Sequence, residues 1–265
     1  MMRSMILGQY VQGDSFIHRM DPRAKLTGLF LFLLVMFLAN RPAALIPAAA
    51  FACFVFLMTR IPVRYLLKGL KFIAIMVIFL FLFRMLMTRE GTVLLDLPWL
   101  PIYEEGVRDG AVFAGRLFLL MVMATVLTLT TTPIELTDAL ERLFKPLQRL
   151  GVPAHELALT MSIALRFIPT LFSEMEKIMK AQMARGASFS DGSIVKRIKA
   201  LIPLLVPLII QSFRRAEELA VAMEARGYAG SEGRTRFRQM VWRASDTRVL
   251  FTVVLTGICI FALRG

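Results

Sequence analysis

Long apolar runs alternate with short polar, mostly basic segments along this chain. A helix needs ~20 predominantly apolar residues to cross a bilayer. Shorter runs can be extended by flanking polar residues whose long side chains reach the lipid headgroups. On this basis the pattern predicts an all-α, polytopic membrane protein with about five transmembrane helices. The five runs cover about residues 26–39, 43–58, 72–87, 111–129 and 249–263.

A different, amphipathic pattern occupies the segment between the fourth and the fifth run. Thr132, Pro133 and Glu135 are typical of a helix start. Apolar residues at spacings of three and four then predict further long helices. Three cytoplasmic or interfacial helices are expected, at about residues 133–150, 153–184 and 193–225. We therefore expect a membrane domain with the first four spans, a helical cytoplasmic domain, and a last span that packs with the membrane domain, covering residues 1–131, 132–247 and 248–265.

The charges of the connecting segments predict how the chain is oriented. The sequence has 32 Lys and Arg against 19 Asp and Glu, a formal net charge of +13. Most of the excess lies between the apolar runs, where it acts as an orientation signal, so nucleic acid is a poor explanation for it. The basic segments before the first run, between the second and third, and over residues 133–248 should be cytoplasmic. The acidic loop 88–110 should be outside, which places the amino terminus inside and the carboxyl terminus outside.

The tripeptide Ala-Arg-Gly occurs twice, where each of the last two amphipathic helices should end. Glycine just past a helix end adopts the left-handed conformation at little cost, and a cation suits the negative end of the helix dipole. Each copy would present a guanidinium that can pair with a carboxylate of another protein. Either copy alone is also compatible with an ordinary helix end and a solvated arginine, but the duplication favours docking on a paired partner. The residues are Ala184, Arg185, Gly186, Ala225, Arg226 and Gly227.

The apolar stripes of the same two helices are a second candidate surface. If the helices pack face to face, the stripes form their own core. If the helices cross, the uncovered remainder forms an apolar groove for a partner. The stretch Leu201–Ile210 has no charge, and it should be buried against another protein or lie in the membrane interface. The candidate groove residues are Met161, Leu165, Ile168, Phe172, Leu204, Leu205 and Leu208.

A local motif marks the start of the first apolar helix. Asp21 can cap this helix, and Pro22 suits its first turn. Arg23 and Lys25 are expected to face the lipid headgroups.

Motifs for catalysis or nucleotide binding are absent from the sequence. It has no phosphate-binding Gly-x-x-x-x-Gly-Lys-Ser/Thr, no Gly-x-Ser-x-Gly and no metal-ligand spacing. We therefore expect a chain that is not an enzyme and holds no cofactor or metal. Two alternatives stay open: a stand-alone secondary carrier that uses Arg84 and Arg116 as substrate groups, and a membrane-embedded enzyme of unrecognised chemistry.

With these residues in view, the chain resembles the transmembrane (T) component of energy-coupling factor transporters, which are ABC-type importers of vitamins and transition metals. The resemblance covers nearly the whole chain. It is most specific at the two Ala-Arg-Gly copies and at Asp21-Pro22-Arg23-Ala24-Lys25.

The resemblance implies a complex with two ATPase subunits and a membrane-embedded substrate-binding (S) component. The ATPases would hold ATP and Mg, and each would bind one Ala-Arg-Gly copy. The groove residues would contact the S component, which reorients as the ATPases move. This chain would be the non-catalytic scaffold that couples the two events.

Overall fold

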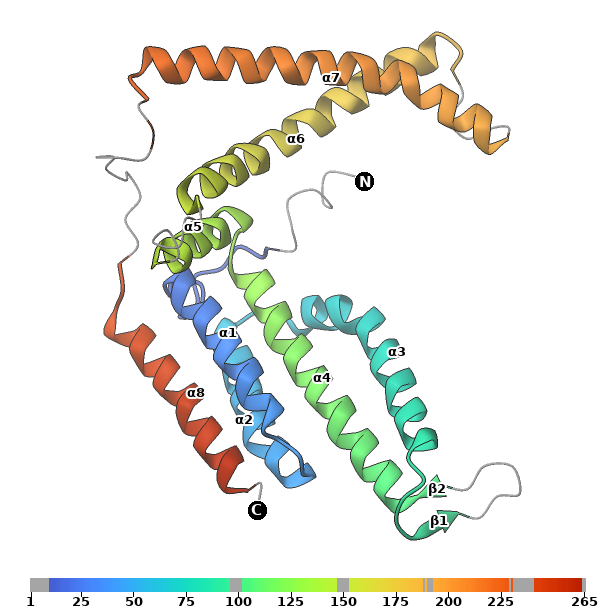
Figure 1. Cartoon of the computed structure of the whole chain (residues 1–265), viewed down its shortest axis with the longest axis vertical. Coiled ribbons are helices and arrows are strands. Elements are labelled where there is room, and N and C mark those ends of the chain that lie inside the picture. The colour runs from blue at the N-terminus through green and yellow to red at the C-terminus, as the bar shows by residue number, and fades with distance from the viewer. Residues whose placement is uncertain are drawn as a thin grey trace. The chain divides into compact units, whose positions relative to one another are not determined.

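A computed structural model of the protein describes residues 10–95, 102–146, 153–187, 189, 193–228, 230 and 241–263. Within these residues the chain is almost entirely helical (Figure 1), which confirms the predicted all-α class. One short hairpin, β1 with β2, joins α3 to α4. The elements are α1 Pro22–Phe37, α2 Pro42–Thr59, α3 Val63–Met87, β1 Val93–Leu95, β2 Ile102–Tyr103, α4 Glu104–Thr130, α5 Pro133–Phe144, α6 Ala154–Ala184, α7 Ile194–Ala225 and α8 Ala244–Ala262.

The helices belong to two compact units, which we describe separately. The membrane unit consists of residues 8–143 and 240–265, with α1–α4, α5 and α8. The second unit includes residues 144–239 and is formed by α6 and α7. The α5 helix begins as the sequence predicted, because Thr132 and Glu135 exchange capping hydrogen bonds of 3.1 and 3.3 Å. Its predicted end near residue 150 lies outside the described residues.

Five helices of the described chain are long and apolar enough to cross a membrane. Four of them, α2, α3, α4 and α8, cover predicted spans. The first predicted run forms α1, whose 16 residues fall short of this length. The fifth is α6 from Glu156 onward, which the sequence pattern assigned to the cytoplasm or interface. The α6 helix is long and apolar enough to cross a membrane because charged residues are sparse in its first half.

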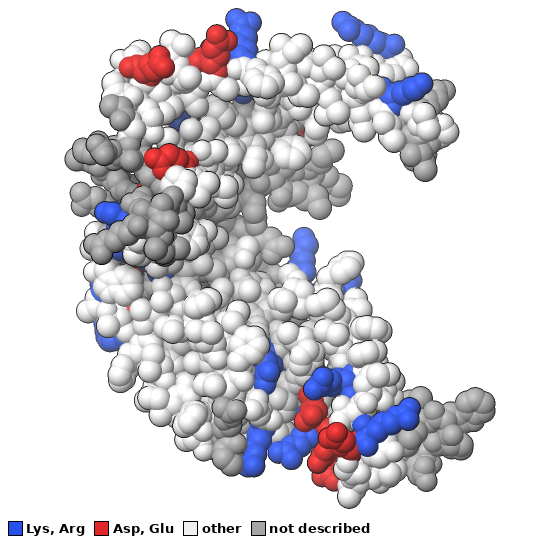
Figure 2. Space-filling view, in the orientation of Figure 1, with Lys and Arg blue, Asp and Glu red and all other residues white. Residues whose placement is uncertain are grey.

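The core of the membrane unit lies where α1, α2, α4 and α8 pack together. Phe32 of α1 is fully buried and stacks on Phe51 of α2, with ring centroids 5.7 Å apart. Other large apolar side chains of the same helices, such as Phe30 and Phe37, point outward and are 61% exposed. On the face shown in Figure 2, uncharged residues cover most of this unit, and acidic side chains lie beside the β1–β2 hairpin. Apolar residues both inside and outside are what a bundle surrounded by lipid requires.

Glycines allow α4 to approach α3 closely. A Cβ atom at Gly106 would lie 2.7 Å from the carbonyl oxygen of Met85 and 3.0 Å from that of Thr88. One turn later, a Cβ at Gly110 would lie 3.2 Å from the carbonyl oxygen of Phe81. Small residues four positions apart let membrane helices bring their backbones together. Here Gly106 and Gly110 do so between α3 and α4, which follow one another in the chain.

Replacement of Gly106 by alanine is expected to lower the free energy of unfolding by about 1–3 kcal/mol, because its methyl group meets backbone atoms that cannot move cheaply. Gly115→Ala is the matched control on the same helix. Its Cβ would meet only the flexible end of Leu45, 2.8 Å away. Thermal unfolding in detergent should show a clear loss for Gly106→Ala and a small change for Gly115→Ala; equal losses would contradict the packing argument.

Candidate functional site

The first Ala-Arg-Gly copy ends α6 in a Schellman motif. Arg185 is the C-cap residue, and Gly186 follows in the left-handed conformation with φ +87°. The Gly186 N–H donates to the carbonyl oxygen of Met183, and the Ala187 N–H donates to that of Gln182, both at 3.0 Å. These two bonds satisfy carbonyl groups that the end of a helix leaves without partners.

The second copy ends α7 in the same way. Gly227 has φ +73°, and its N–H donates to the carbonyl oxygen of Glu224 at 2.9 Å. The Tyr228 N–H donates to the carbonyl oxygen of Met223 at 3.0 Å. The two helix ends lie where the sequence predicted them, and they share one hydrogen-bond pattern. We call the segments Ala184–Gly186 and Ala225–Gly227 the arginine tips.

Both tips are open on all sides within the described chain. The Arg185 and Arg226 side chains are exposed. Apart from the glycine itself and its two chain neighbours, no atom of the described chain lies within 4 Å of a Cβ added at Gly186 or Gly227. The glycines are therefore needed for their backbone conformation and not for space, and the guanidinium groups are accessible to another protein.

Gly186→Ala is expected to fray the last turn of α6, since a left-handed alanine costs about 1–2 kcal/mol. Gly186→Asn should fray it less, because asparagine tolerates this conformation better. Amide hydrogen exchange at residues 181–187 measures the effect. The predicted order of exchange rates is alanine fastest, then asparagine, then wild type; three equal rates would show that the cap does not depend on glycine.

The predicted groove residues lie on α6 and α7 with unequal exposure. Met161, Ile168, Phe172 and Leu205 are exposed, whereas Leu165 and Leu208 are partly covered. Leu204 is only 6% exposed, so it is a packing residue of this unit. Phe213 of α7 belongs to the apolar pattern of this helix but was not among the predicted groove residues, and it is 74% exposed.

The start of α1 is capped as predicted. Asp21 Oδ1 accepts a hydrogen bond of 2.9 Å from the Arg23 backbone N–H, and Pro22 occupies the first turn. The Arg23 guanidinium donates to both carboxylate oxygens of Asp21, at 3.0 and 2.7 Å. Burial by itself raises the pKa of Asp21, but the hydrogen bonds and charge of Arg23 outweigh it and hold this pKa below its usual value. The ionised carboxylate thus stabilises the fold above about pH 4, and this contribution is lost as the pH falls through the lowered pKa.

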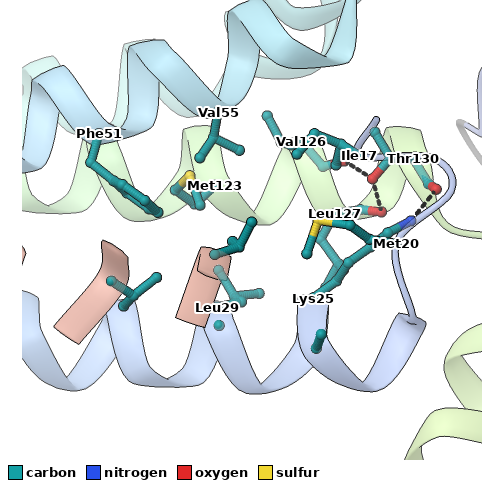
Figure 3. A pocket seen from close by; sticks show the side chains of 14 residues that line it. Ile17, Met20, Lys25, Leu29, Phe51, Val55, Met123, Val126, Leu127 and Thr130 are labelled. Carbon is teal, nitrogen blue, oxygen red and sulfur yellow. Dashed lines mark hydrogen bonds between the residues drawn. The ribbon is translucent and has the colours of Figure 1, made fainter. Parts of the chain in front are cut away.

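The expectation that Lys25 faces the headgroups is wrong. Its side chain is buried, and Nζ donates to the carbonyl oxygen of Thr130 at 2.9 Å (Figure 3). Nζ also donates to Thr131 Oγ1 at 3.2 Å. A third bond of 3.4 Å reaches the carbonyl oxygen of His18. Lys25 therefore caps the carboxyl end of α4, where a cation also suits the helix dipole.

Asp246 completes this cluster from the start of α8. It is fully buried and accepts a 3.4 Å hydrogen bond from the Asp21 N–H and a 2.8 Å bond from the Arg243 N–H. The Arg23 guanidinium lies 5.7 Å from the centre of the Trp242 ring. We call Asp21, Arg23, Lys25, Thr130, Thr131 and Asp246 the polar junction. Arg243 and Asp246 have the spacing of a capping box, but they are not the Ser or Thr and the Glu or Gln that mark this motif in a sequence, so Asp246 was not identified from the sequence.

An apolar pocket adjoins the polar junction (Figure 3). It is lined by residues of α1, α2, α4 and α8, such as Phe51 and Met123, and by Met20 just before α1; among the described residues that line it, Lys25 is the one that carries a charge. Because the Lys25 ammonium is occupied by three protein oxygens, the pocket offers no free charged group to a ligand.

Lys25→Met is expected to lower the free energy of unfolding by about 1–3 kcal/mol, since it leaves the Thr130 carbonyl without its donor in an apolar setting. Lys68→Met is the matched control, because Lys68 is an exposed lysine at the start of α3. Thermal unfolding in detergent should separate the two variants. A loss of the same size at both positions would refute a specific role for the buried ammonium.

The two arginines considered as substrate groups of a secondary carrier have partners inside the protein. Arg116 of α4 donates to the carbonyl oxygen of Ala39 and, at 3.4 Å, to Asn40 Oδ1, at the α1–α2 turn. The Arg84 guanidinium lies 5.8 Å from the centre of the Phe113 ring. Among the described residues, no group of three or more His, Cys, Asp or Glu side chains could hold a metal ion.

Comparison with known proteins agrees with a membrane component of a transporter. Residues 13–237 match the family described as CbiQ, cobalt transport protein. The energy-coupling factor transporter transmembrane protein EcfT of Bacillus subtilis (strain 168) is 51% identical over 265 residues, covering all of both chains. EcfT of Bacillus selenitireducens is 50% identical over 264 residues, covering 100% of this chain and 98% of the relative. EcfT of Streptococcus thermophilus is 41% identical over 264 residues, covering 100% of both. The chain therefore belongs to the CbiQ family, as a transmembrane component of an energy-coupling factor transporter.

Proposed function

We propose that this chain is the non-catalytic scaffold of a micronutrient importer. It would couple ATP hydrolysis by two bound ATPase subunits to the reorientation of a membrane-embedded S component that carries a vitamin or a metal. ATP and Mg would be bound by the ATPases, and this chain would need no cofactor.

The two arginine tips carry this proposal. Both are exposed, both end a helix of about thirty residues, and both use the same capping geometry. A guanidinium at such an end can form two parallel hydrogen bonds with a carboxylate. Two equivalent tips suit two ATPase subunits, each with an acidic side chain in its docking groove.

The uncovered apolar surface of α6 and α7 supports a partner within or beside the membrane. Met161, Phe172 and Leu205 are 52%, 38% and 50% exposed, and Phe213 is more exposed still. An S component embedded in lipid would cover such a surface with apolar side chains of its own. We propose that the exposed and partly covered groove residues contact the S component. Leu204 would instead support them from the interior of the α6–α7 unit.

The orientation that follows places the arginine tips in the cytoplasm, where ATP is available. It rests on the basic segments before the first span and between α2 and α3, and on the acidic loop between α3 and α4. The amino terminus would then be inside the cell and the carboxyl terminus outside.

Removal of both tip guanidiniums, by Arg185→Ala with Arg226→Ala, is expected to abolish ATP-dependent uptake. Each lost charge-assisted pair should weaken ATPase binding by about 2–5 kcal/mol. The experiment isolates membranes with a tagged chain and measures both substrate uptake and the ATPase subunits that co-purify. The double variant should stay in the membrane at wild-type level.

Arg166→Ala with Lys199→Ala is the matched control, because it removes two exposed cations from the same two helices away from the tips. This control should retain the ATPases and transport. Normal uptake by the tip variant would remove the proposed role of the tips. Uptake by the purified chain in liposomes without ATP would instead establish a stand-alone carrier.

A further inference from the structure

An ion pair joins α6 and α7, which cross one another (Figure 1). The Arg215 guanidinium of α7 donates to Glu174 Oε1 of α6. The side chains are 33% and 14% exposed, so the pair is largely withdrawn from solvent. The second carboxylate oxygen, Glu174 Oε2, is buried and has no hydrogen-bond partner among the described residues.

The burial makes Glu174 dependent on Arg215. Loss of one member of a buried pair leaves an uncompensated charge, which strongly disfavours the arrangement. The neighbouring pair of Arg214 with Glu218 is different. It lies within α7 alone, and its side chains are 80% and 65% exposed, so it should contribute little.

Apolar packing alone does not define the angle between α6 and α7. In the described parts of the two helices, the buried apolar residues are Ala158 and Leu204, and most large apolar side chains are exposed. Apolar burial is also non-directional, so it holds the helices together without selecting one crossing angle. A hydrogen-bonded ion pair joins defined atoms of the two helices and therefore can select it.

The Glu174–Arg215 pair lies at the same distance along the chain from the tip arginine of each helix. Arg185 follows Glu174 by 11 residues, and Arg226 follows Arg215 by the same 11 residues. At 1.5 Å per residue, each tip arginine lies about 16 Å along its helix from the pair. The prolines inside these helices, Pro169, Pro203 and Pro207, all precede the pair. Two uninterrupted helical arms of equal length thus connect the ion pair to the tips.

We propose that the Glu174–Arg215 pair is a brace that holds the two arginine tips at a set separation. Equal, stiff arms suit a partner with two equivalent sites a constant distance apart, which two ATPase subunits bound to each other would provide. Glu174 and Arg215 are then positioning residues that do not touch the ATPases. This inference rests on the proposed function of the tips.

The distance between the tips can be measured in the full-length chain in lipid nanodiscs, without any ATPase. Spin labels are attached at Met183→Cys and Glu224→Cys, exposed positions in the last turns of α6 and α7, in a Cys53→Ser, Cys259→Ser background. Double electron–electron resonance should give one narrow distance distribution. Arg215→Gln should broaden it, and the exchanged pair Glu174→Arg with Arg215→Glu should narrow it again. Arg214→Gln is the matched control and should change nothing.

A second measurement uses the assembled transporter. Arg215→Gln should weaken retention of the ATPases about tenfold, as about 1.4 kcal/mol of lost preorganisation would give, and the exchanged pair should recover most of it. The brace is refuted if Arg215→Gln leaves the distance distribution narrow, or if the exchanged pair stays as broad as the single variant. It is also refuted if the distribution broadens while ATPase retention is unchanged. The tip variants test the proposed function separately, because they leave the brace in place.

Discussion

A buried ammonium surrounded by apolar side chains must keep its hydrogen bonds, because no water replaces them. Lys25 meets this constraint through the last carbonyl of α4, the Thr131 hydroxyl and the His18 carbonyl. Asp21 and Asp246 attach the start of α8 to the same turn of α1. The chain leaves the membrane unit only at the end of α5, after residue 143, and returns at residue 240, just before α8. The polar junction therefore ties the end of α4 and the start of α8 to the start of α1 within the membrane unit.

The α6–α7 unit differs from the membrane unit, because little of it is buried. It has few buried apolar residues and leaves most of its large apolar side chains uncovered. Such a unit gains little stability from its own core, so a directional contact between its helices has a larger share in its geometry. This combination suits a part that transmits a rigid-body motion: the arms are stiff, and the surfaces are free to bind.

The arginines discussed above fall into two groups, those paired within the protein and those exposed at helix ends. Arg116 and Arg215 each join two segments of one unit, through a backbone carbonyl and a carboxylate, and Arg23 holds the capping carboxylate of Asp21 at the start of α1. Arg185 and Arg226 are exposed at helix ends, with no ion pair in the described part of the chain. Of these two groups, the second has its guanidiniums available to another protein, and the proposed coupling role rests on these two residues.

Local features of this protein could be predicted from its sequence, because they depend on neighbours a few positions away. The apolar runs, the Asp21 cap, the start of α5 and the two glycine-capped helix ends are of this kind. The burial of Lys25 could not be predicted, since its acceptor Thr130 lies 105 positions further along the chain and only the packing of α1 on α4 brings them together. The same holds for Asp246, for Leu204 and for the Glu174–Arg215 pair. The sequence by itself determined which helices form and where α6 and α7 end; the tertiary structure alone decided which charges are withdrawn from solvent and paired, because that depends on contacts between distant helices.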